Sequence, residues 1–155
     1  MLNFNSNGLL VPANNIKSDI LELEGVFVTN IRTINRKELF EKYISYSNSL
    51  KELCNVNLKQ WIDGSFVTKK SEPQDIDLIT FIDFKIVEVL NDSLTDYKYP
   101  ASKTIFGVDA YIIRTYPTDH KYYLSYRADQ AYWMDHFSRT RRNRIGNKLQ
   151  KDFWK

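Results

Sequence analysis

The clearest pattern along the chain is a helical one between residues 35 and 55. Asn35 belongs to the residue types that cap helix starts, and Glu38 stands three positions later, as in a capping box. Apolar side chains then recur at the spacing of one helix face, at Leu39, Phe40, Tyr43, Ile44, Tyr46, Leu50, Leu53 and Cys54. The spacing therefore predicts a helix over residues 35–55.

Three apolar stretches rich in β-formers predict strands, at residues 58–62, 76–82 and 108–116. Residues 84–96 and 125–142 have helical patterns, and Asp83 is placed to cap the first of them. Residues 1–33, with polar turns and short apolar pieces, predict an irregular lead-in. The order helix, strand, turn, strand, helix, strand, helix is typical of an α+β domain with a small mixed sheet.

The length and composition of the chain limit the kinds of protein that it can be. A chain of 155 residues, 43% apolar and 14% aromatic, predicts one globular domain over residues 1–155. No apolar run approaches the roughly 20 residues of a membrane helix, and the N-terminus lacks the pattern of a secretion signal. The single cysteine, Cys54, falls in the helical pattern, which favours a buried, inert thiol. We therefore expect a cytoplasmic protein with no membrane partner.

The charge is distributed unevenly. Residues 139–155 contain seven Lys or Arg and one acid, a net charge of +6, which leaves −3 on the first 138 residues because the whole chain carries +3. A basic tail on an acidic body is typical of proteins with an anionic partner, such as RNA or a nucleotide triphosphate. A solvated C-terminal end or a contact with a partner protein explains the same composition, so these interpretations stay open.

Carboxylates in the predicted strands are the first candidate chemistry. Asp75 and Asp77 flank Ile76, so their side chains point the same way, and Asp109 lies in the third predicted strand. Neighbouring carboxylates repel one another unless a cation lies between them, and Mg²⁺ prefers oxygen ligands. If Asp109 faces the same side, the three side chains can hold two Mg²⁺ (or Mn²⁺) ions. We expect magnesium carried with a nucleotide, rather than a side chain, to be their positive partner.

The Gly64-Ser65 turn supplies the complementary half of this site. Backbone N–H groups and the Ser65 hydroxyl can converge there on an anion, and Gly64 allows a phosphate to approach the backbone. Lys69 and Lys70 follow in the connecting loop and add positive charge. We predict a phosphate-holding turn.

In this order the motifs resemble the DNA polymerase β-like nucleotidyltransferase superfamily. The resemblance lies in Ile62-Asp63-Gly64-Ser65, Asp75-Ile76-Asp77-Leu78 and Val108-Asp109-Ala110. More narrowly, the chain looks like a member of an uncharacterised bacterial family of minimal nucleotidyltransferase-like proteins. The segments that carry this narrower resemblance are NGLLVP, WIDGSFVTKKSEPQDIDL, FGVDAY and the aromatic and basic C-terminal region.

The resemblance implies a nucleotidyltransferase-like small mixed β-sheet with helices packed on it. It implies that Asp75 and Asp77 bind the metals, that Asp109 is a ligand and takes part in deprotonating the acceptor, and that Gly64 and Ser65 hold the phosphates. The implied activity moves a nucleoside monophosphate, AMP from ATP, to a hydroxyl of a protein or RNA. A toxin–antitoxin or defence context follows from the resemblance alone.

The sequence departs from that superfamily in the connecting loop, and other functions also fit parts of it. Lys69 and Lys70 stand where glycine and arginine are often found, and Gln74 replaces a small or polar residue, so nucleotide choice does not carry over. A catalytically inactive binding module for a partner protein or RNA is the main alternative. His120 and His136 lack zinc-ligand spacing, and Ser65 lacks the elbow motif of a serine hydrolase.

The aromatic residues near the C-terminus have two interpretations. They form a set within the last predicted helix and just before it, at Tyr122, Tyr123, Tyr126, Tyr132, Trp133 and Phe137. Packing in the core is the commoner use of such a set. A stacking surface for a nucleotide base is the other.

Overall fold

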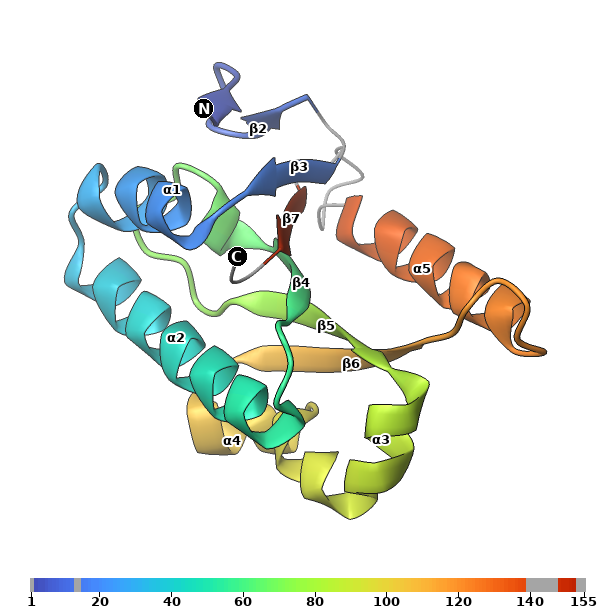
Figure 1. The fold of residues 1–155 in the computed structure, drawn as a ribbon. Helices are drawn as coiled ribbons and strands as arrows, with labels where there is room; N and C mark the ends of the chain where they lie inside the picture. Colours follow the sequence, from blue (N-terminus) through green and yellow to red (C-terminus); the bar gives the residue numbers. More distant parts are fainter. Residues whose placement is uncertain (1, 13–14, 139–147, 153–155) are drawn as a thin grey trace.

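The computed structural model describes residues 2–12, 15–138 and 148–152, which form a mixed α/β architecture (Figure 1). Five strands make one mixed sheet in the order β3-β7-β4-β5-β6. Their bounds are Asn15–Ser18 for β3, Lys59–Asp63 for β4, Asp77–Asp83 for β5, Asp109–Thr115 for β6 and Lys148–Asp152 for β7. Because β5 pairs antiparallel with β4 and parallel with β6, the three predicted strands lie side by side.

Helices cover both faces of this sheet. α1 (Ile20–Glu24) and α2 (Ile34–Cys54) lie on one side, and α5 (Tyr123–Ser138) lies on the other (Figure 1). Within the described part of the chain, no helix combines the length and the apolar character needed to cross a membrane. The predicted long helix and the three predicted strands are confirmed, with each end differing by one residue.

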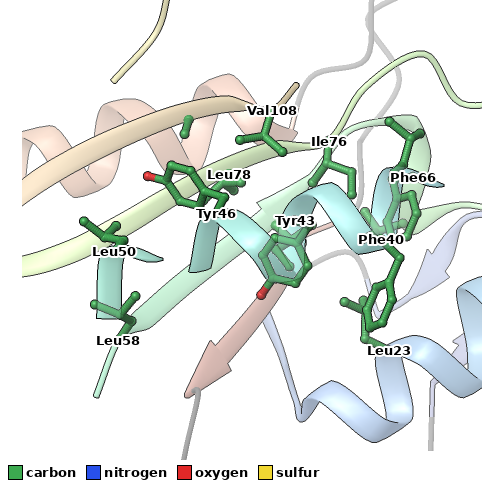
Figure 2. Packing of buried hydrophobic residues seen from close by; sticks show 14 of the residues in the cluster. Leu23, Phe40, Tyr43, Tyr46, Leu50, Leu58, Phe66, Ile76, Leu78 and Val108 are labelled. Carbon is green, nitrogen blue, oxygen red and sulfur yellow. The ribbon is translucent and has the colours of Figure 1, made fainter. Parts of the chain in front are cut away.

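The larger core lies between α2 and the sheet (Figure 2). Tyr43, Tyr46 and Leu50 of α2 pack there with Leu78 of β5 and with Val108, which directly precedes β6. Side chains alternate along a strand, so the intervening residues face α5 and form a second cluster, which contains Trp61, Ile79, Phe81, Ile113 and Phe137. β4 and β5 are therefore buried on both faces.

A buried hydrogen-bond network fixes α2 on the sheet. Gln60 Oε1 accepts bonds from Tyr43 Oη at 3.0 Å and Ser47 Oγ at 3.2 Å, and Gln60 Nε2 donates to Thr80 Oγ1 at 2.9 Å. All four side chains are buried. Since satisfied buried networks favour one packing arrangement, this one sets the position of α2 over β4 and β5.

The prediction of an irregular lead-in over residues 1–33 is wrong. The segment contains ordered elements, namely β1 (Asn3–Phe4), β2 (Leu10–Val11), β3, α1 and the π-helix η1 (Gly25–Thr29). Asp19 caps α1 by accepting a bond from the backbone N–H of Glu22. Leu23 and Phe27 are fully buried, so the segment contributes to the larger core.

Two helix boundaries also differ from the predictions. Thr33, rather than Asn35, caps α2 by accepting a bond from the backbone N–H of Arg36 at 3.3 Å. The helix predicted over residues 84–96 is α3 (Phe84–Leu90), which continues as the 3₁₀ helix η3 (Asn91–Tyr97). The predicted cap at Asp83 is confirmed, because its side chain accepts a bond from the backbone N–H of Lys85 at 2.8 Å.

The basic C-terminal region is only partly a tail. Residues 148–152 form β7, which pairs with β3 on one side and β4 on the other. These pairings provide partners for its backbone N–H and C=O groups, which explains a strand in a polar sequence. The remaining residues of the predicted tail, 139–147 and 153–155, lie outside the described residues.

We expect the thiol of Cys54 to react slowly in the folded protein, as its predicted buried position implies. Cys54 is buried at the end of α2, and burial raises the pKa of its thiol to about 11. At pH 8 only about 0.1% of it is thiolate, so we expect Ellman's reagent to react roughly 100-fold more slowly with the native protein than with protein unfolded in guanidinium. Equal rates for the two states contradict the buried position.

Candidate functional site

Three aspartates from neighbouring strands meet at one end of the sheet. Asp77 begins β5 and is paired with Asp109, which begins β6, and with Asp63, which ends β4. Residues paired directly across strands project from the same face, so all three lie on the face that α5 covers. The register places Asp77 beside Asp109, which meets the condition that the sequence left open for a shared site.

The ammonium of Lys103 lies between Asp75 and Asp109. Its Nζ is 2.9 Å from Asp109 Oδ1, 3.0 Å from Asp109 Oδ2 and 3.4 Å from Asp75 Oδ2. The hydrogen bond to Asp109 is the main cause that raises the pKa of Lys103, which is therefore charged at neutral pH. The side chains are 49% exposed for Lys103, 28% for Asp75 and 14% for Asp109, so solvent reaches the cluster.

Sequence reasoning missed Lys103 because no pattern marked its helix, α4 (Ala101–Phe106). The buried Ser102 anchors this helix, since its Oγ donates to the Val108 carbonyl at 2.9 Å and accepts from the Ala110 N–H at 3.3 Å. Gly107, at φ +75°, ends α4 and leads into β6. The backbone of Lys103 is therefore fixed relative to the strand that carries Asp109.

The predicted turn at Gly64 packs against Asp77. Gly64 has φ +81° and ψ −166°, a conformation open to glycine alone, and it precedes the 3₁₀ helix η2 (Ser65–Val67). A Cβ atom on Gly64 would lie 2.3 Å from Asp77 Oδ2. The glycine is thus required by the close approach of the carboxylate, and the structure brings Gly64 together with Asp77.

The loop after this turn holds the two predicted phosphate-binding lysines. The backbone N–H of Lys69 donates to the Gly8 carbonyl at 2.9 Å, and its Nζ lies 5.1 Å from the centroid of the Phe4 ring. These contacts hold Lys69 against the hairpin of β1 and β2. The Lys70 side chain is exposed, and its carbonyl accepts bonds from Arg36. A phosphate-binding role for Lys69 and Lys70 stays a prediction.

An aromatic stack lies beside the carboxylates. Tyr111 follows Asp109 by two residues on the same face of β6, with its ring 5.9 Å from Tyr99 and 4.4 Å from Trp133. Burial raises the pKa of Tyr111, and the negative charges of Asp109 and Asp77 raise it further. Of these rings only Trp133 belongs to the predicted aromatic set, so Tyr99 and Tyr111 are additions from the structure.

The rest of the predicted aromatic set is divided between core and surface. Phe137 is buried, and Tyr126 and Trp133 pack on the same cluster between α5 and the sheet. Tyr122 and Tyr132 are about half exposed or more. The core interpretation therefore holds for the inner face of α5.

The donor chemistry of the aspartates fits a hard divalent cation. Asp75, Asp77 and Asp109 offer carboxylate oxygens, the ligands that Mg²⁺ and Mn²⁺ prefer, and Gly64 leaves room for one of those carboxylates. Across residues 2–12, 15–138 and 148–152, no three His, Cys, Asp or Glu side chains are arranged as a metal-binding group in this state. Lys103 lies between two of the candidate ligands, so a metal requires a different side-chain arrangement.

One comparison with known proteins places the chain in a family. The model of a family of unknown function, DUF6932, matches residues 2–152. The chain belongs to the DUF6932 family. The match covers every candidate residue of the site, so the aspartates, the turn and Lys103 all lie within the DUF6932 region. No curated protein and no solved structure matches the chain.

Proposed function

We propose that this DUF6932 protein is a metal-dependent nucleotidyltransferase with a nucleotidyltransferase-like sheet. It transfers AMP from ATP to a hydroxyl of an acceptor protein or RNA. One observation carries the proposal: the pairing of Asp77 with Asp109 at the strand ends, directly beside the Gly64 turn. This placement supports the resemblance to the polymerase β-like superfamily, in which a Gly-Ser turn and three acids share one site.

In the proposed reaction, the acceptor oxygen forms a bond to the α-phosphorus of ATP. The bond from that phosphorus to the oxygen shared with the β-phosphate breaks, and pyrophosphate leaves. Asp109 accepts the hydroxyl proton, while Gly64 and Ser65 hold the phosphates with help from Lys69 and Lys70. Asp75, Asp77 and Asp109 would hold the divalent ions, which would neutralise the phosphate charge when bound. Positioning and electrostatics account for most of the catalysis of such transfers.

Calorimetry with ATP tests this function. We expect ATP to bind in the presence of Mg²⁺ and to lose at least about 10-fold in affinity with EDTA or in the double variant Asp75→Asn/Asp77→Asn. The matched control is Glu88→Gln/Asp96→Asn, which removes two exposed acids outside the site and should bind like the parent. ATP binding that is indifferent to both metal and the Asp75 and Asp77 changes contradicts the proposal.

A second candidate function is favoured by the Lys103 ion pairs. A lysine that pairs with both Asp75 and Asp109 is consistent with a nucleotidyltransferase fold that binds a partner protein or RNA without turnover. Radiolabelled α-phosphate of ATP, incubated with the protein and cell extract, separates the two. Label transferred to an acceptor, and lost in the Asp109→Asn variant, supports the enzyme; binding without transfer supports the module. A labelled acceptor that is a toxin protein would support the toxin–antitoxin context.

A further inference from the structure

Lys103 is a charged group of this site that the proposed transfer does not use. It contacts two of the three proposed metal ligands, at 2.9 Å and 3.0 Å for Asp109 and 3.4 Å for Asp75. Two carboxylates drawn to one ammonium cannot offer the same oxygens to a divalent ion.

The side chain of Lys103 can leave this position without disturbing the fold. Ser102 and Gly107 fix the backbone of α4 on β6, whereas the Lys103 side chain is about half exposed. Lysine has a flexible four-carbon stem and a strongly hydrated ammonium, so solvation offsets much of the loss of an exposed ion pair. The carboxylates, by contrast, are held by the start of β6 and by the segment that enters β5.

We propose that Lys103 and a divalent cation bind Asp75 and Asp109 in mutually exclusive states, so that Lys103 sets the affinity of the site for metal. This inference rests on the proposed function. A divalent ion brings a charge of +2 to these carboxylates, whereas the Lys103 ammonium brings +1. The ion is therefore attracted more strongly and displaces the lysine. Lys103 holds the carboxylates together in the metal-free state and turns into solvent when metal enters.

Titration with Mn²⁺ alone, without nucleotide, tests the competition. We expect Lys103→Gln to bind Mn²⁺ about 10-fold more tightly than the parent, because the competing ammonium is gone. The matched control is Lys85→Gln, which removes an exposed lysine next to the other end of β5 and should change the affinity less than about 2-fold. Asp75→Asn/Asp77→Asn should abolish binding in either background.

A second measurement separates displacement from simple repulsion between lysine and metal. With ¹³C-dimethylated lysines, the Lys103 resonance, assigned by its loss in Lys103→Gln, should move toward those of exposed lysines as Mg²⁺ saturates the site. A Lys103 resonance that stays unchanged at saturation overturns displacement.

The remaining outcomes distinguish the inference from the proposed function. Equal Mn²⁺ affinity of the parent and Lys103→Gln, with binding still lost in Asp75→Asn/Asp77→Asn, overturns the competition and leaves the metal site standing. Failure of every variant to bind Mn²⁺ or Mg²⁺, while circular dichroism shows them folded, overturns both.

Discussion

Replacing Arg36 with methionine is expected to lower the free energy of unfolding by about 3–5 kcal/mol. The guanidinium is fully buried, and it binds four backbone carbonyls, those of Phe27, Phe66, Thr68 and Lys70. Burial lowers the pKa of Arg36 to about 10, so it keeps its charge at pH 7. Methionine fills much of the same space but donates no hydrogen bond, so four carbonyls lose their partner.

Most of the hydrogen bonds lost in Arg36→Met hold the loop that follows the Gly64 turn. Arg36 Nη1 donates to the Phe66 carbonyl at 2.7 Å, and Nη2 donates to the Thr68 carbonyl at 2.7 Å, while the guanidinium carbon lies 5.2 Å from the centroid of the Phe66 ring. One side chain of α2 thus fixes the shape of the segment that leads from β4 toward the aspartates. We infer that Arg36 is a positioning residue for the proposed phosphate-holding turn.

Urea unfolding followed by tryptophan fluorescence measures this effect. Lys37→Met is the matched control, since Lys37 is the next residue of the same helix, is exposed, and forms a weak surface ion pair with Glu41 at 3.9 Å. We expect a change below about 0.5 kcal/mol. Arg36→Lys keeps the charge but loses the planar fork, so an intermediate loss is expected. Arg36→Met within about 1 kcal/mol of the parent would show that the carbonyls find other partners.

The sequence predicts a helix or strand correctly where the pattern that marks it is local. Helical spacing located α2, and the apolar run after Ile76 located β5, which begins at Asp77, whereas Asp75 lies in the segment that enters the strand. Leu23 and Phe27, four positions apart, have the same kind of spacing in the segment before α2, although the polar turns ahead of them predict an irregular lead-in.

Other features depend on contacts between distant segments and leave no local signal. β7 has a polar sequence, and it is a strand because β3 and β4 provide partners on both sides. Lys103 is one lysine among many, and it matters because Ser102 fixes its short helix on β6. The buried Arg36 likewise gains its role from carbonyls about 30 positions along the chain.

Replacing Gly64 with alanine is the second substitution with a large expected effect, because two independent causes add. At φ +81° and ψ −166° an alanine is strained by about 1–3 kcal/mol, and its Cβ would lie 2.3 Å from Asp77 Oδ2. Either the turn or the carboxylate has to move. We expect Gly64→Ala to lose at least about 2 kcal/mol of stability. If Asp77 binds metal, it should also lose at least about 10-fold in Mg²⁺-dependent affinity for ATP.

The chain contains a matched control for this substitution. Gly25 lies in right-handed helical backbone, and a Cβ there would meet nothing within 4 Å, so Gly25→Ala should leave stability unchanged or raise it by up to about 1 kcal/mol. Unfolding curves of the two variants then separate the loss of a glycine from the loss of space beside Asp77. If Gly64→Ala is as stable as Gly25→Ala, the Asp77 carboxylate does not pack closely enough against residue 64 to exclude a Cβ atom. A destabilised Gly64→Ala protein that still binds Mg²⁺ and ATP like the parent would separate the turn from the nucleotide site.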